Sequence, residues 1–350
     1  MTAASGLGPW EGTDVLEAQT AVVGELTSTP TGVDGLPFLV QLPGRGYGAE
    51  PTGRGTALLV EMSAELGPHG WKLADRPGRD ASRAAAFLRQ DLDALAVAAY
   101  GYAGPLVVAA TGPLTLASRL YLARGDRVLS DAGAVRELSA SLGAGLAEHL
   151  AAVRVAVPGA APVLVLEESG LAEVLLGRVS NFSGNSVIRA VPTGIVSELL
   201  RTVAEAARAA GARDAAGAAR VVVHCGPSWV PVRSVVAAGA DGVGLSVAGF
   251  NQQGWERIGE AVEGGVALWA GLPAALPNVS SSRKGGPDVV GQAAALLRPW
   301  GKLGLPVAAL RDVVVVAGEA PSAPTPDAAR TSLADVIRAA EVVAERAEGA

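Results

Sequence analysis

Short, apolar, β-branched runs alternate with longer alanine- and leucine-rich stretches along the whole chain, and this alternation limits the possible folds more than any other feature. Most of the runs are apolar throughout, which is typical of parallel strands that are buried on both faces. We predict eight such strands: Ser5–Gly8, Phe38–Leu42, Leu106–Ala110, Val163–Glu167, Val221–Cys225, Gly242–Val247, Val266–Ala270 and Val313–Ala317.

Apolar residues with helical spacing follow these strands. Eight βα units favour a closed barrel over an open sheet, so the expected fold class is α/β, a single (β/α)8 TIM barrel. We expect one barrel domain over residues 1–350, with a C-terminal helix at about residues 328–347. The predicted helices are Thr56–Leu66, Arg79–Tyr100, Asp131–Val153, Ile195–Ala210, Pro231–Ala238, Gln253–Glu263, Val289–Leu297 and Ala328–Ala347.

The composition argues against several classes of protein. The net charge is -6 and no block of Lys and Arg stands out, so we expect no nucleic-acid partner. A single cysteine cannot form an internal disulfide, and the apolar runs are too short to cross a bilayer. The N-terminus also lacks the basic and apolar regions of a signal peptide. We therefore expect a cytoplasmic protein without a membrane partner, and its alanine-, glycine- and arginine-rich usage is typical of a bacterial genome rich in G and C.

The fifth predicted strand ends in His224 and Cys225, and Cys225 is the only cysteine of the chain. Histidine and cysteine at the C-terminal end of a barrel strand are how such a fold would present ligands to zinc. Adjacent residues of a strand point to opposite faces, however, so His224 and Cys225 cannot both face the barrel axis unless a bulge or turn begins there. Three interpretations stay open: a rebuilt zinc site that adds a carboxylate such as Glu319, a structural histidine beside a core cysteine, or a metal-free acid or base.

Four ordered motifs together carry a family resemblance. They are Gly6–Asp14, Leu166–Leu171, Val221–Gly226 and Gly239–Ser246. In this order and spacing the chain resembles the catalytic barrel of cobalamin-independent methionine synthases, a barrel of the kind that uroporphyrinogen decarboxylases share. The resemblance implies a methyltransferase that passes a methyl group from methyl-tetrahydrofolate to the thiol of homocysteine. It also implies zinc, which would bind that thiol as the thiolate.

The metal ligands that the resemblance implies are only partly present. His224 matches the family's histidine, whereas the family's next cysteine falls on Gly226 and its glutamate falls on Ser246 or, as the alternative, on Val247. The second cysteine would follow the eighth strand, where the chain reads Val315–Glu319. His224 and Cys225 are therefore the candidate metal ligands of an incomplete set.

The remaining candidate site residues lie at the ends of the first, fourth and sixth predicted strands. By resemblance, Glu167 takes the place of an aspartate that binds the amino acid, and Pro9 replaces a serine that meets its carboxylate. We predict His224 and Glu167 as catalytic residues, and we predict that the substrate binds to Gly8, Trp10, Glu167, Glu168 and Ser246. One of the two glutamates is expected to face the barrel mouth, and the other to pair with an arginine or a helix N-terminus.

Two glycine-rich loops are candidate anion sites, although an ordinary solvated loop is the alternative for each. The first carries Arg45, Tyr47 and Arg54, and the second is Ser280–Gly286. Two functions stay open for the whole chain. It is either a methionine synthase-like methyltransferase that acts on a homocysteine-like thiol or amino acid, or a non-catalytic barrel that binds an amino-acid or folate-like ligand without zinc.

Overall fold

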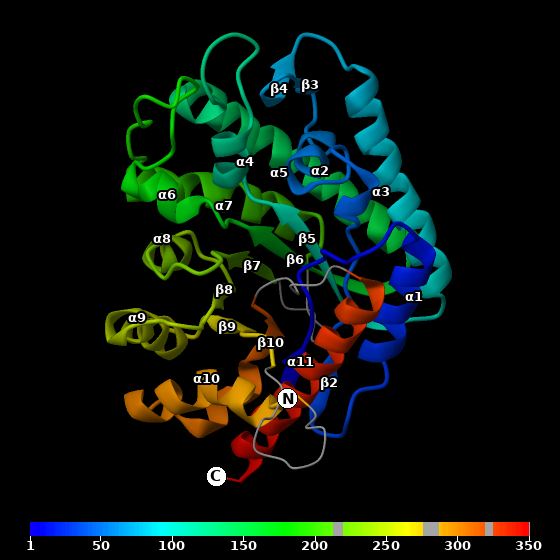
Figure 1. Cartoon of the computed structure of the whole chain (residues 1–350), viewed down its shortest axis with the longest axis vertical. Helices are drawn as coiled ribbons and strands as arrows, with labels where there is room; N and C mark the ends of the chain where they lie inside the picture. Colours follow the sequence, from blue (N-terminus) through cyan, green and yellow to red (C-terminus); the bar gives the residue numbers. More distant parts are fainter. Residues whose placement is uncertain (213–219, 276–286, 319–324, 350) are drawn as a thin grey trace.

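Eight parallel strands form one curled sheet at the centre of the computed structural model, which describes residues 1–212, 220–275, 287–318 and 325–349 (Figure 1). The strand order is β2-β1-β10-β9-β8-β7-β6-β5. The strands of this sheet are β1 (Thr2–Ala4), β2 (Val33–Gly35), β5 (Ala103–Thr111), β6 (Gly159–Glu167), β7 (Val221–His224), β8 (Gly242–Ser246), β9 (Ala267–Leu272) and β10 (Val314–Ala317).

The curled sheet is TIM-barrel-like, because its two edge strands approach each other. The chain that follows β2 makes an isolated parallel bridge from Phe38 to Val107 of β5. Two backbone hydrogen bonds support this bridge: Leu39 N–H donates to the carbonyl of Val107 at 2.9 Å, and Val107 N–H donates to the carbonyl of Pro37 at 2.8 Å. The predicted α/β class with an eight-stranded parallel sheet is thus confirmed.

Helices surround the sheet and connect its strands (Figure 1). The long helix α11 contacts β1, β2, β10 and α10, and it brings the end of the chain back to the first strand. The α-helices are α1 (Val15–Leu26), α2 (Pro51–Ala57), α3 (Arg79–Ala98), α4 (Pro113–Arg119), α5 (Ala132–Ala156), α6 (Leu171–Leu176), α7 (Thr193–Ala209), α8 (Val232–Ala237), α9 (Gln252–Glu263), α10 (Val289–Leu303) and α11 (Pro326–Glu348). Short 3-10 turns are η1 (Pro43–Arg45), η2 (Val128–Ser130) and η3 (Val307–Asp312).

The first quarter of the chain departs most from the sequence-based prediction. The predicted strands Ser5–Gly8 and Phe38–Leu42 are wrong in position, because the ladder is made by the residues before them, in β1 and β2, and Phe38–Leu42 makes only isolated bridges. Helix α1 was not predicted, although the Asp14 carboxylate accepts from the backbone N–H groups of Leu16 and Glu17 and begins the helix. Helices α4 and α6 were also not predicted.

The predicted helix Thr56–Leu66 is wrong over most of its length. Helix α2 ends at Ala57, and the chain then forms an antiparallel hairpin of β3 (Ser63–Gly67) and β4 (Gly70–Ala74). The hairpin buries the indole of Trp71 and pairs with the loop at Tyr121 through Lys72. This tertiary burial overrides the local helical spacing, and the hairpin lies near α2 and α3 (Figure 1).

The interior is one connected hydrophobic cluster that valine, leucine and alanine dominate. Trp269 of β9 and Trp300 of α10 are the largest fully buried side chains. Within the described residues, no helix is both long enough and apolar enough to cross a bilayer.

Candidate functional site

Strand register brings the principal site residues into one row. Glu167 of β6 is paired with His224 of β7, and His224 is paired with Gly244 of β8. Paired residues of parallel strands point to the same side of the sheet, so these positions share one face. Gly244 leaves the space that the imidazole fills, because a Cβ atom at this position would lie 2.4 Å from Cδ2 of His224.

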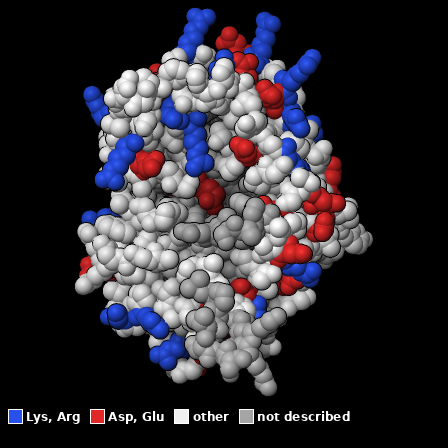
Figure 2. All heavy atoms as spheres, viewed as in Figure 1, with Lys and Arg blue, Asp and Glu red and all other residues white. Residues whose placement is uncertain are grey.

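This row opens into a cavity of about 420 Å³, which is within the range of small-molecule sites. The cavity lies at the C-terminal ends of β1, β6, β7, β8 and β10, and α11 forms its far wall. That edge of the sheet is where barrel enzymes place their active sites. The molecular surface in Figure 2 is hollowed near its centre, and an acidic side chain is visible in the hollow.

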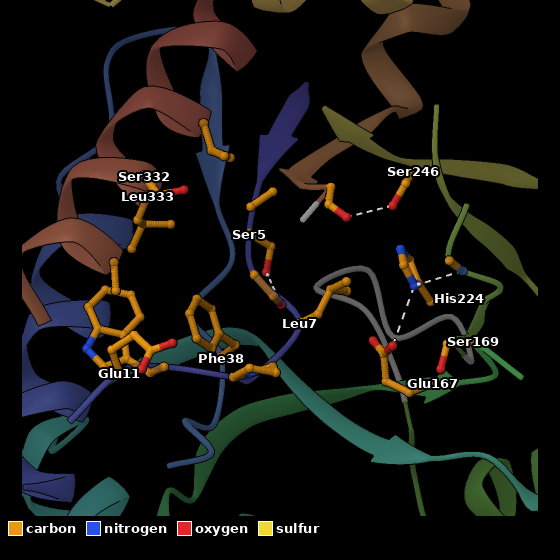
Figure 3. Close-up of a pocket in the computed structure, with 18 of the residues that line it drawn as sticks. Ser5, Leu7, Glu11, Phe38, Glu167, Ser169, His224, Ser246, Ser332 and Leu333 are labelled. Carbon is orange, nitrogen blue, oxygen red and sulfur yellow. Dashed lines mark hydrogen bonds and ion pairs between the residues drawn. The ribbon is translucent and has the colours of Figure 1, made fainter. Parts of the chain in front are cut away.

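Glu167 and His224 form a close pair inside the cavity (Figure 3). Oε2 of Glu167 lies 3.5 Å from Nδ1 of His224, and the N–H of Gly226 points to the same nitrogen at 3.4 Å. His224 is only 4% exposed, whereas the side chain of Glu167 is 27% exposed. Nε2 of His224 and Oε1 of Glu167 are buried without a hydrogen-bond partner among the described residues. Buried polar atoms are normally paired, so these two atoms are available to a ligand.

Glu168 points away from this pair and holds the N-terminus of α4. Its carboxylate accepts hydrogen bonds from the backbone N–H groups of Leu114 and Thr115, and from the hydroxyl of Thr115 at 2.6 Å. Complete burial raises the pKa of Glu168 to about 7, while these hydrogen bonds act in the opposite direction. Glu168 is not among the residues that line the cavity. The geometry therefore corresponds to a helix cap rather than to a substrate contact.

Cys225 also points away from the cavity. It is fully buried, its thiol lies 3.9 Å from the carbonyl oxygen of Val223, and it does not line the cavity. Burial raises the pKa of the Cys225 thiol well above its usual value, and the negative charges of Glu168 and Glu167 raise it further. A thiol that stays protonated is a poor metal ligand.

The described residues do not fit a four-ligand zinc site. They contain no group of three or more His, Cys, Asp or Glu side chains that could hold a metal ion. Gly226 provides no ligand, and the hydroxyl of Ser246 donates to the carbonyl of Gly318 at 2.7 Å. Glu319, the carboxylate considered for a rebuilt site, lies outside the described residues.

The N-terminal loop contributes apolar walls to the cavity. Trp10 is buried, lines the cavity and lies with its ring 6.2 Å from the ring of Phe38. Pro9 also lines the cavity, whereas Gly8 does not. Gly8 has a φ of 101°, and a Cβ atom there would lie 2.9 Å from the side-chain amide of Gln41. Gly8 is therefore placed for a backbone turn behind the cavity wall.

The arginines of the first candidate anion loop pair with a buried carboxylate of the protein and do not face an open anion site. Arg45 and Arg54 both pair with Asp91 of α3, and all three side chains are buried. Tyr47 is exposed, and the second candidate loop, Ser280–Gly286, lies outside the described residues. Arg45 lies two positions after Pro43, which lines the cavity, but does not line it itself.

Several lining residues were not singled out from the sequence. They share positions that only the tertiary fold brings together: Ser5, Leu7, Phe38, Ser169, Ala329, Ser332, Leu333 and Val336. The last four follow a pattern that the sequence does show. Counted from Ala329, they lie three, four and seven residues apart, which places them on one stripe of α11. The sequence alone does not indicate that this stripe faces a cavity.

Comparison of the sequence with protein-family models finds no match, and no curated protein matches it either. Several solved structures are similar in fold. A B12-independent methionine synthase from Shewanella sp. W3-18-1, solved in complex with selenomethionine, matches 80% of this chain and 72% of its own chain, with 12% identity and a TM-score of 0.50. A 3-dehydroquinate dehydratase from Geobacillus kaustophilus HTA426 matches 95% and 90% of the two chains, with 13% identity and a TM-score of 0.35.

The first of these likenesses defines a class of protein by its fold. The likeness to the methionine synthase, at 12% identity, shows an α/β protein with a curled, TIM-barrel-like parallel sheet. It agrees in fold with the resemblance that the four sequence motifs carry. Substrate and chemistry do not follow from a likeness at this level of identity.

Proposed function

We propose that this chain is a methionine synthase-like methyltransferase, which transfers a methyl group from a methyl-tetrahydrofolate donor to the thiol of a homocysteine-like amino acid. The observation that carries the proposal is Nε2 of His224, which is buried at the cavity beside the carboxylate of Glu167 and has no hydrogen-bond partner in the part of the chain that the structure describes. The fold likeness and the ordered motifs support the same reaction class. The proposal includes closure of the sheet as a full (β/α)8 barrel, which the bridge between Phe38 and Val107 supports.

In this proposal His224 acts first as a base and then as an acid. The step requires the tautomer in which the neutral imidazole carries its proton on Nδ1, directed to Oε2 of Glu167 and not free to accept from Gly226. Nε2 then takes the proton from the substrate thiol, and the carboxylate of Glu167 stabilises the imidazolium that forms. The thiolate then attacks the methyl carbon, so that a C–S bond forms while the C–N bond of the donor breaks. The electron pair of that bond goes to the donor nitrogen, which receives the proton from the imidazolium. Atoms and charge balance without a further reactant.

This route uses no metal, because the described side chains do not provide a zinc ligand set. It agrees with the inward position of His224 and the outward position of Cys225. Glu167 can also bind the substrate ammonium group through Oε1, which has no partner among the described residues.

A second candidate function is a barrel that binds an amino-acid or folate-like ligand without catalysis. The observation that favours it is the loss of ligand groups at the family's metal positions, where Gly226 and Ser246 stand. In that case the Glu167–His224 pair would orient the ligand rather than move a proton.

The test is a methyl-transfer assay with 5-methyltetrahydrofolate and L-homocysteine, with methionine measured by mass spectrometry. We expect His224→Gln to lower the rate by about 10²- to 10⁴-fold, as for the loss of an acid–base group. His69→Gln, at an exposed histidine, is the matched control, and Cys225→Ala should retain activity. Full activity in His224→Gln contradicts the proposal. Binding of L-methionine without turnover supports the second function, and stoichiometric zinc that is lost in His224→Gln refutes the metal-free route.

A further inference from the structure

The cavity has two chemically different ends (Figure 3). His224, Glu167, Ser169 and Ser246 lie at one end, as Figure 3 shows. The other end lies beneath α11, where the figure places Leu333 and Ser332. The polar pair described above occupies only the first end, so the second end has no role in the proposed proton transfers.

Helix α11 presents a regular stripe to this second end. Its side chains at Ala329, Ser332, Leu333 and Val336 line the cavity, and three of the four are apolar. Phe38 faces them across the space and is 2% exposed, while Leu333 is 5% exposed. These walls belong to a long helix packed against β1 and β2, so the apolar surface is fixed in place before any ligand binds.

The volume of the cavity exceeds that of homocysteine. An apolar cavity of about 150 Å³ holds one benzene molecule, so a cavity of about 420 Å³ has room for on the order of fifteen non-hydrogen atoms. Homocysteine or methionine would fill little more than half of that space. The remaining part is the end that Phe38 and the α11 stripe enclose. The lining of this end is mostly apolar, and its polar groups are the hydroxyl of Ser332 and the carboxylate of Glu11, which Figure 3 places at the same end. An unbranched alkyl chain fits the apolar walls that Phe38 and the α11 stripe provide.

We propose that the ligand of this site is an amphipathic amino acid or thiol, whose polar head lies at Glu167 and His224 and whose unbranched apolar chain, longer than that of homocysteine, lies against α11. This inference rests on the proposed function for the polar end and extends it to the substrate class. Burial of each further methylene group is worth about 0.8 kcal/mol, or about fourfold in affinity.

The test uses a series of straight-chain L-2-amino acids as probes, with affinity measured by calorimetry on the full chain. From L-norleucine to L-2-aminodecanoic acid, a gain of about four methylene groups should tighten binding by up to about 200-fold. Ser332→Phe should reduce that ratio toward one, because the ring would fill the compartment. Thr331→Phe is the matched control, since Thr331 is exposed and does not line the cavity, and it should keep the ratio. Ser332→Leu provides a smaller block if the phenylalanine variant does not fold.

The outcomes separate this inference from the proposed function. Methyl transfer to homocysteine without a gain in affinity along the series overturns the inference alone. Length-dependent binding without methyl transfer supports the inference and refutes the proposed reaction. No binding of any probe also overturns the inference. If 5-methyltetrahydrofolate displaces L-2-aminodecanoic acid but not L-norleucine, the compartment holds the methyl donor and the inference is wrong.

Discussion

Asp91 provides the sharpest test of what holds the cavity loop in place. This carboxylate of α3 is fully buried and pairs with two guanidinium groups, those of Arg45 and Arg54. Nη2 of Arg45 lies 2.5 Å from Oδ1 of Asp91, whereas Nε and Nη1 of Arg45 have no hydrogen-bond partner among the described residues. The guanidinium carbon of Arg45 lies 4.7 Å from the ring centre of Phe87. Burial lowers the pKa of Arg54, while the charge of Asp91 acts in the opposite direction. The cluster therefore already carries one more positive charge than negative.

Asp91→Asn should destabilise the protein strongly. The variant keeps the shape of the side chain but leaves two buried guanidinium groups, which cannot release their protons, without a carboxylate. Removal of one partner from a buried ion pair costs about 3–5 kcal/mol, and we expect a loss in this range. The same variant should weaken ligand binding, since Pro43 lines the cavity two residues before Arg45.

The assay is urea unfolding followed by circular dichroism, with Glu65→Gln as the control. Glu65 pairs with Lys72 at 2.9 Å, but both side chains are about 40% exposed, so this loss should not exceed about 1 kcal/mol. The triple variant Arg45→Met, Arg54→Met, Asp91→Leu should recover much of the stability, because apolar side chains need no counter-charge. If Asp91→Asn and Glu65→Gln lower the free energy of unfolding equally, the buried cluster does not act as described.

Two further predictions concern α4 and the floor of the cavity. Burial raises the pKa of Glu168 from 4.5 to about 7. The contribution of this carboxyl group to stability is therefore fully present below about pH 4.5 and is lost as the pH rises through 7. The loss amounts to about 3 kcal/mol. The free energy of unfolding of the wild type relative to that of Glu168→Gln should fall by that amount from about pH 4 to about pH 8. If this difference in stability does not vary with pH, the hydrogen bonds from α4 keep the carboxylate ionised. Gly244→Ala would put a Cβ atom 2.4 Å from His224, so the imidazole must move and methyl transfer should fall by about 10²-fold. Gly301→Ala, which meets no neighbouring atom, should leave the rate unchanged.

Burial pattern explains which strands could be predicted. The runs of β5 to β10 are apolar throughout because both faces of the sheet are covered, and their positions were predicted to within a few residues. The first two strands are only three residues long, and their ladder partners lie in β10 and in each other. Such short pairings depend on distant segments, so local periodicity placed them several residues too late. Helix α1 had a readable signal in Asp14 and Glu17, which have the spacing of a helix N-cap with an acidic third residue.

The polar end of the site was easier to predict than its apolar end. Glu167 and His224 each end an apolar run, and parallel strands bring their C-terminal ends to one edge of the sheet. The sequence did not reveal that Gly244 makes room for the imidazole or that α11 closes the far side of the cavity, because both depend on contacts between distant segments. The Arg45–Asp91–Arg54 cluster was missed for the same reason: Asp91 lies in the middle of α3, and its two partners lie in the 3-10 turn η1 and in α2.

Gly226 and Ser246, where the resemblance would place a cysteine and a glutamate, have structural roles, so a zinc site would be difficult to build here by single substitutions. Gly226 has a φ of 61°, so a cysteine there would have a strained backbone, although its Cβ atom would make only an ordinary contact with Ser169 at 3.6 Å. A glutamate at Ser246 would lose the hydrogen bond to Gly318 and add a charge in a position that is 5% exposed. Each change would also alter the space that the proposed amino-acid head occupies beside Glu167. The geometry of this cavity thus favours a proton-transfer site built on His224 and Glu167 over a metal site in which, within the described part of the chain, only His224 of the four implied ligands is in place.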